Sequence, residues 1–162
     1  MPEWTRKSKK PRFTPAKKKA IEADDLQAVM VSVKQEKIFD LMDAVGKRDR
    51  AAALFHLDGM LGAGTHPIPL HAQIANHVKK LLRAKSLAAE GKSRDQVAAE
   101  MGGHPFATGK VIDQAKNYGL GELRGSLGLL SHTDFDLKNS RANDRAVLEK
   151  LILDLCASSG RV

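Results

Sequence analysis

Several residue types are scarce in this sequence of 162 residues. It contains a single cysteine, Cys156, and aromatic residues make up 4% of the chain. One cysteine cannot form an intramolecular disulfide, which excludes a disulfide-stapled secreted domain. It also excludes a zinc site built from several thiolates. Cys156 follows Leu151, Ile152 and Leu155, so we expect a buried, inert thiol in a reducing compartment.

Long apolar runs are missing as well. No stretch approaches the roughly 20 apolar residues that a membrane-spanning helix needs, so we expect no contact with a membrane. The N-terminus is basic but lacks the apolar core of a secretory signal. These absences predict a cytoplasmic protein.

The net charge of +8 is divided unevenly along the chain. Residues 1–20 hold eight lysines and arginines against one glutamate, whereas residues 21–162 hold 19 basic and 18 acidic residues. We interpret residues 1–20 as a disordered basic arm that can contact nucleic-acid phosphates without sequence preference. A solvated arm without a fixed partner explains the composition at least as well. The candidate phosphate contacts in the arm are Lys9, Lys10, Arg12, Lys17, Lys18 and Lys19.

Beyond the arm, apolar residues recur with helical spacing and no strand pattern competes. Residues 21–37 are expected to form a short helix over 22–31 and a connector over 32–37. Ile38–Leu61 then predicts two amphipathic helices separated by Gly46–Asp49, with Asp49 as the cap of the second. The apolar face of that second helix is expected to contain Leu54, Phe55, Leu57 and Leu61.

Glycine, proline and capping residues predict the next boundaries. The glycines and prolines of residues 62–69 end one helix and begin another, which covers 70–90. Ser93 is placed to cap a short helix that ends at Gly102–Gly103. Pro105 suits the first turn of the helix that follows.

Two further helices complete the chain, the last beginning at Asn143 or Asp144. We therefore expect an all-α fold, a bundle of about six or seven short amphipathic helices, whose main domain covers residues 38–158. Three glycines would each cost about 1 kcal/mol relative to alanine in mid-helix, unless close helix packing requires them. They are Gly59, Gly125 and Gly128.

The sequence contains no convincing phosphate-binding, metal-binding or catalytic motif. Gly103–Lys110 has the outline of a phosphate-binding loop, but His104 and Val111 replace its first glycine and its magnesium-binding hydroxyl. The six histidines show no metal-ligand spacing, and His71 and His77 should lie on different faces of one helix, as surface or cap residues. The sequence thus predicts no catalytic, cofactor-binding or metal residues and no cofactor, and an enzyme is the least favoured class.

One segment resembles a DNA-binding motif. Ser93–Asn117 has the helix, turn and helix of a helix-turn-helix, although its turn, Gly102–Pro105, is longer than usual once the cap is counted. An αα-corner inside a bundle is the favoured alternative. The second helix is expected to expose Thr108, Lys110, Gln114 and Lys116, of which Lys110 and Lys116 are the candidate nucleic-acid contacts.

Four motifs occur in the order found in one protein family. The set resembles the C-terminal region of the delta subunit of bacterial DNA polymerase III, part of the clamp loader, over residues 22–157. The motifs are IFDLMDAVGKRD (Ile38–Asp49), LLRAKSLAAEG (Leu81–Gly91), VAAEMGGHPF (Val97–Phe106) and DLKNSRANDRAVLEKLILDLC (Asp136–Cys156).

The resemblance implies an all-helical collar domain that packs against the corresponding domains of other loader subunits. The resemblance implies gamma/tau-like and delta-prime-like subunits as partners and contact with DNA only through the assembled complex. It implies nucleotidyltransferase activity only for the polymerase holoenzyme to which such a subunit belongs. The family's ATPase-like modules and clamp-opening element precede this region, where this chain has residues 1–20, so we expect it not to open a clamp. A small basic DNA-binding protein that uses residues 93–117 and the arm is the alternative function.

Overall fold

The computed structural model describes residues 23–139 and 141–157, in which all regular secondary structure is helical. The predicted all-α fold is therefore confirmed, with seven helices in the described ranges. Within these ranges, none of the helices has the length and hydrophobicity of a membrane span. The helices are α1 (Ala23–Gly46), α2 (Arg50–Gly62), α3 (Pro67–Ala89), α4 (Arg94–Met101), α5 (Pro105–Ala115), α6 (Leu120–Asn139) and α7 (Asp144–Cys156).

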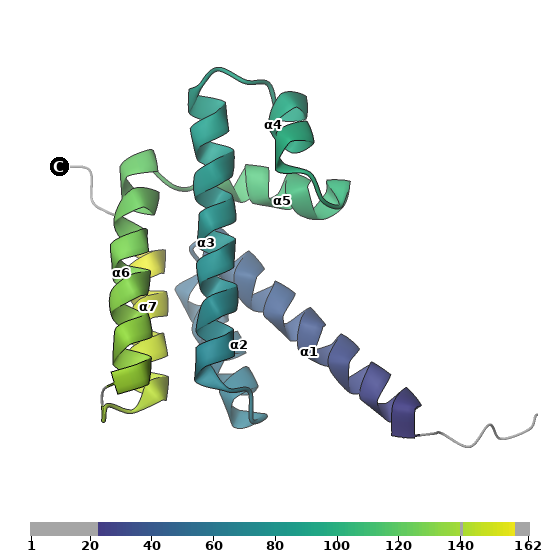
Figure 1. Cartoon of the computed structure of the whole chain (residues 1–162), viewed down its shortest axis with the longest axis vertical. Helices are drawn as coiled ribbons and strands as arrows, with labels where there is room; N and C mark the ends of the chain where they lie inside the picture. Colours follow the sequence, from purple (N-terminus) through teal and green to yellow (C-terminus); the bar gives the residue numbers. More distant parts are fainter. Residues whose placement is uncertain (1–22, 140, 158–162) are drawn as a thin grey trace, which may run out of the picture.

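Helix α3 forms the centre of the bundle (Figure 1). It packs along α6 on one side, and on the other side it contacts α4, α5 and the C-terminal part of α1. Helix α7 packs against α6 and α2, and α2 packs against α1. Because α3 has neighbours on two sides, it must bury more than one narrow apolar stripe.

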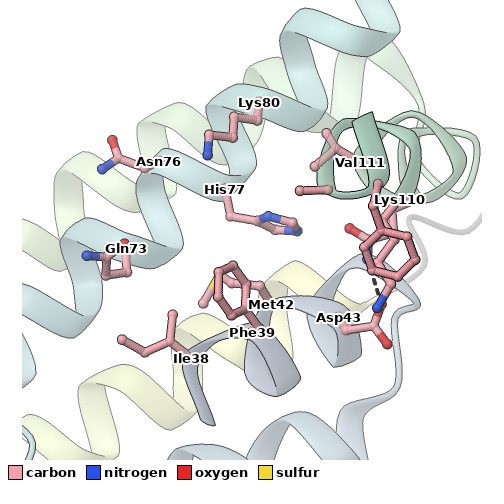
Figure 2. Close-up of a pocket in the computed structure, with 13 residues that line it drawn as sticks. Ile38, Phe39, Met42, Asp43, Gln73, Asn76, His77, Lys80, Lys110 and Val111 are labelled. Atoms are coloured by element: carbon pink, nitrogen blue, oxygen red, sulfur yellow. Dashed lines mark hydrogen bonds between the residues drawn. The ribbon is translucent and has the colours of Figure 1, made fainter. Parts of the chain in front are cut away.

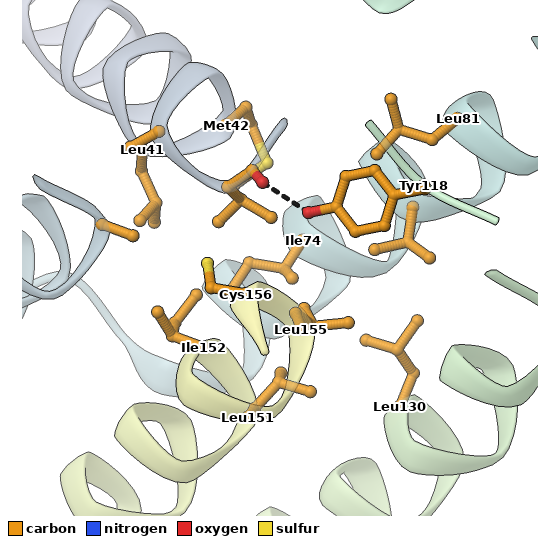
Figure 3. Packing of buried hydrophobic residues seen from close by; sticks show 14 of the residues in the cluster. Leu41, Met42, Ile74, Leu81, Tyr118, Leu130, Leu151, Ile152, Leu155 and Cys156 are labelled. Carbon is orange, nitrogen blue, oxygen red and sulfur yellow. Dashed lines mark hydrogen bonds between the residues drawn. The ribbon is translucent and has the colours of Figure 1, made fainter. Parts of the chain in front are cut away.

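The apolar core joins α1, α2, α3, α6 and α7 (Figure 3). Each of these helices contributes at least one leucine or isoleucine that is almost completely buried, and full burial of such a side chain contributes roughly 1.5–3 kcal/mol. Examples of these leucines and isoleucines are Leu41, Leu57, Ile74, Leu81, Leu123, Leu151 and Ile152.

Cys156 also belongs to this core. It is only 2% exposed, and burial raises the pKa of its thiol, which confirms the predicted buried cysteine.

The helix starts lie where the capping residues predict them. The carboxylate of Asp49 accepts the backbone N–H of Ala52 at 3.0 Å and begins α2. Ser93 and Gln96 form a capping box at the start of α4. Pro105 occupies the first turn of α5, and Asn143 caps α7.

Two predictions about the first helices are wrong. Residues 32–37 do not connect two helices, because α1 is continuous from Ala23 to Gly46. The predicted connector contains Lys, Gln and Glu, which favour helix, and no glycine or proline that would end one. Phe55 does not belong to the buried face of α2, since its side chain is 75% exposed. Leu54 and Leu57, three positions apart, lie on the same face of α2. Phe55 follows Leu54 by one position, and this rotates its side chain by about 100° away from Leu54.

Close packing does not explain the three mid-helix glycines. A Cβ atom added at Gly59, Gly125 or Gly128 would have no neighbouring atom within 4 Å. Gly46, at the end of α1, differs from them, because a Cβ there would lie 2.3 Å from both Cδ and Oε1 of Gln114. Among these four glycines, only Gly46 lacks room for a Cβ atom unless the Gln114 side chain moves.

Candidate interaction surface

The N-terminal half of α1 extends away from the bundle (Figure 1). Every residue over 23–37 is exposed, whereas five residues between Leu41 and Gly46 are buried. Helical segments of this length are marginally stable in water without packing partners. The exposed half of α1 is therefore held mainly through its continuity with the packed half.

Four apolar side chains on this exposed half lie on one face. Leu26, Val29, Met30 and Val33 follow the spacing i, i+3, i+4 and i+7, which places them in one row along a helix. They are between 44% and 61% exposed. We call this row the α1 stripe. Contiguous exposed apolar side chains of this kind mark interaction sites in soluble proteins.

A groove with a volume of about 390 Å³ lies between α1, α3 and α5 (Figure 2). We call it the α1–α3–α5 groove. Phe39 of α1 and Phe106 of α5 both line it, and their side chains are 66% and 69% exposed. Its volume falls in the range of sites that hold a ligand or a side-chain anchor. The other apolar lining residues include Ile38, Met42 and Val111.

Two buried polar side chains of the groove are incompletely paired. No hydrogen bond of normal geometry reaches His77 Nε2 or Gln114 Oε1 within the described residues, although the Gln114 side chain lies close enough to His77 to raise its pKa against the effect of burial. The amide Nε2 of Gln114 donates to Asp43 Oδ1 at 2.8 Å, so only one end of this side chain is satisfied. Burial, with a smaller effect of Lys80, lowers the pKa of His77 to about 4. His77 is therefore a neutral imidazole at pH 7.

Lysines stand on two sides of the groove. Lys80 of α3 and Lys110 of α5 line it, and neither forms an ion pair with any residue of the described ranges. The Lys110 ammonium lies 5.2 Å from the ring centre of Phe106. The groove thus combines an apolar interior with two lysines that have no carboxylate of the described residues within ion-pair distance, although Asp43 attracts Lys110 at longer range.

The structure changes the set of residues predicted to bind nucleic acid. Lys110 and Lys116 are exposed, and Lys116 pairs with Asp113 at 3.0 Å. The predicted exposure of Thr108 and Gln114 is wrong, because both are buried on the side of α5 that faces the bundle. The exposed polar surface of α5 is therefore reduced to Lys110 and the Asp113–Lys116 pair, which is small for reading bases. The arm residues Lys9, Lys10, Arg12, Lys17, Lys18 and Lys19 lie outside the described residues.

The histidines are also more varied than predicted. His71 and His77 do lie on different faces of α3, toward α6 and toward the groove, but both are buried instead of exposed. His71 Nε2 lies 3.0 Å from the carbonyl oxygen of Leu130. His104 is a cap, as predicted, with Nδ1 accepting the N–H of Phe106. The described residues contain no group of three His, Cys, Asp or Glu side chains that could hold a metal ion.

The fold and these surfaces define the class of this protein as an all-helical bundle domain with an exposed apolar helix face and an apolar groove. Both surfaces are suited to contacts with another macromolecule. Neither surface is among the features predicted from the sequence. The spacing of the α1 stripe is visible in the sequence, whereas the groove depends on three helices meeting.

The chain belongs to the family of the DNA polymerase III delta subunit, C-terminal domain, which matches residues 35–155. It is 27% identical over 135 residues to DNA polymerase III subunit delta of Bacillus subtilis (strain 168), covering 83% of this chain and 39% of that protein. A solved structure, the Bacillus subtilis DNA clamp loader delta protein (YqeN), superposes with a TM-score of 0.67 and 27% identity. That match covers 82% of this chain and 39% of the solved chain.

These comparisons confirm the resemblance seen in the sequence. They also show that this chain spans about two fifths of the length of the relatives, as expected for a match to a C-terminal domain.

Proposed function

We propose that this domain is a collar-type scaffold in DNA replication, which associates with gamma/tau-like and delta-prime-like subunits of a clamp loader. The family supports a place in such a complex, since the similar solved structure is a clamp loader delta protein. The observation that carries the scaffold role is the α1 stripe, an apolar row that the rest of the described residues leaves exposed. In this proposal the chain supplies no chemistry, and the other subunits hydrolyse ATP.

The proposed mechanism is burial of the α1 stripe against an apolar helix face of a neighbouring subunit. Leu26, Val29, Met30 and Val33 each still expose about half of their side-chain surface. Covering half of such a side chain contributes roughly 1 kcal/mol, so the four together can stabilise a complex by a few kcal/mol before the cost of association. The continuous helix places the four side chains in one row that a partner helix can contact.

The double variant Leu26→Asp/Met30→Asp tests this proposal. It places two charges in the middle of the stripe, and we expect binding to purified loader subunits to fall by about tenfold or more in surface plasmon resonance. Both side chains are exposed, so circular dichroism and thermal unfolding should stay unchanged. The matched control is Gln35→Asp, on the opposite side of α1, which should bind like the wild type.

Two outcomes would overturn the proposal. Undiminished binding of the double variant would show that the stripe is not the contact. Failure of the wild-type chain to bind any loader subunit at micromolar concentration would remove the scaffold role itself.

A further inference from the structure

The α1–α3–α5 groove is a second surface that the α1 stripe does not explain. Phe39 and Met42 line the groove, whereas Val33 belongs to the stripe, and helical spacing places the two sets on different sides of α1. One partner helix lying along the stripe would therefore leave the groove open. The groove needs its own occupant.

We propose that the groove binds an amphipathic helix with acidic residues beside its apolar face, supplied by a neighbouring protein. This inference deepens the proposed function by naming a surface and the chemistry of the segment that fills it. Only the identity of that neighbour as a loader subunit rests on the proposed function.

The two phenylalanines explain why the occupant should be amphipathic. Phe39 and Phe106 stand on separate helices, α1 and α5, and both rings remain about two thirds exposed. Ile38 and Val111 also line the groove. An inserted leucine or aromatic side chain would cover apolar surface on both walls at once, which is how helix-in-groove complexes gain most of their affinity.

Charge explains why the occupant should be acidic. Lys80 and Lys110 approach from α3 and α5, and no carboxylate of the described residues lies within ion-pair distance of either. The carboxylate that lines the groove, Asp43, binds Lys47 and the amide of Gln114 and attracts Lys110 only at longer range. Residues 1–20 of the same chain carry eight basic residues and one acidic residue, so the lysines would repel them.

The floor of the groove favours a polar side chain in the middle of the occupant's apolar face. Nε2 of His77 can donate or accept according to its tautomer, and Oε1 of Gln114 accepts. Buried polar atoms without partners cost free energy, so a hydroxyl or amide that pairs with one of them would add to affinity.

Fluorescence anisotropy with the full chain tests the inference directly. The probe is a labelled helical peptide with leucines on one face and glutamates beside them, and a matched peptide has lysines in place of the glutamates. We expect the glutamate peptide to bind the wild type more tightly. Lys80→Glu/Lys110→Glu should weaken that binding by about tenfold or more and should favour the lysine peptide instead.

The control and a second variant use other exposed residues. Lys79→Glu, next to Lys80 but outside the groove lining, should change binding by no more than about twofold. Phe39→Ala/Phe106→Ala should weaken both peptides, because it removes the apolar walls. Exposure of these side chains lets each variant fold, which circular dichroism verifies.

The inference is overturned if neither peptide binds or if the charge reversal has no effect on peptide binding. It is also overturned if the chain forms a dimer that Lys80→Glu/Lys110→Glu disrupts, because the occupant of the groove would then be a second copy of the chain. Binding of loader subunits without peptide binding would contradict the proposed role of the groove but not the proposed scaffold function. Peptide binding without binding of loader subunits would contradict the scaffold function but not the role of the groove.

Discussion

The guanidinium of Arg48 lies 4.1 Å from the ring centre of Tyr118 and links three segments of the chain. Its Nε donates to the carbonyl oxygen of Asn117 at 2.8 Å, Nη1 to that of Ala157 at 2.6 Å, and Nη2 to Oε2 of Glu122 at 2.6 Å. Arg48 adopts a φ of 59°, which is uncommon outside glycine. Through these contacts Arg48 connects the loop after α1 to the start of α6 and to the end of α7.

Removal of this side chain should destabilise the fold. For Arg48→Ala we expect a loss of about 2–4 kcal/mol in the free energy of unfolding, because three hydrogen bonds and a cation–π contact are lost from a site only 14% exposed. Urea unfolding at pH 7 measures it. Lys47→Ala is the control, since its ion pair is exposed, and it should have little effect. Equal losses in the two variants would contradict the role of Arg48.

Gly46 should not tolerate a side chain. In Gly46→Ala the new Cβ would lie 2.3 Å from Gln114, and overpacking of this kind costs about 1–3 kcal/mol. Gly128→Ala is the matched comparison in open space, where alanine should stabilise the helix by about 0.5–1 kcal/mol. Thermal and urea unfolding of both variants should therefore shift in opposite directions. An increase in the stability of Gly46→Ala would show that the Gln114 side chain can move aside without a loss of folding free energy.

Acid should weaken the fold between pH 6.5 and 4. The pKa of His77 is lowered from 6.5 to about 4 by burial, and next by Lys80. Within this window the unfolded chain binds a proton that the folded chain does not, so stability falls as the pH falls, by up to about 3 kcal/mol. Burial lowers the pKa of His71 in the same direction. Below pH 4 this contribution should stop changing.

Urea unfolding at several pH values checks this prediction. His77→Leu should flatten the dependence of stability on pH in that window, because it removes the group that is protonated only on unfolding. His132→Gln, a change at an exposed position, is the matched control. An unchanged slope in His77→Leu would assign the pH dependence to other groups.

Any DNA binding should come from the basic arm and not from α5. Lys110→Ala/Lys116→Ala should leave affinity for duplex DNA nearly unchanged, since Thr108 and Gln114 are buried beside them and Lys116 is paired. Deletion of residues 1–20 should abolish the binding, which should weaken steeply with salt. Anisotropy titrations over a range of salt concentrations measure both. Sequence-specific binding that depends on Lys110 would instead support the helix-turn-helix interpretation.

Local chemistry made much of the fold predictable. Asp49, Ser93 and Asn143 accept backbone N–H groups within their own helices, and Pro105 fits a first turn through its fixed φ. These interactions involve residues close in sequence, so helix starts could be placed without knowledge of the packing. Leucine spacing similarly predicted the core.

Residue patterns along the chain predicted the all-α fold, the helix caps, the uneven charge and the family resemblance, but not the continuity of α1. Packing between helices sets which faces are covered. It buries His71 and His77 because α3 has neighbours on two sides, exposes Phe55, and leaves the α1 stripe open. The groove exists only because α1, α3 and α5 meet. Burial depends on contacts between residues far apart in the chain, and the periodicity of a single helix does not encode those contacts.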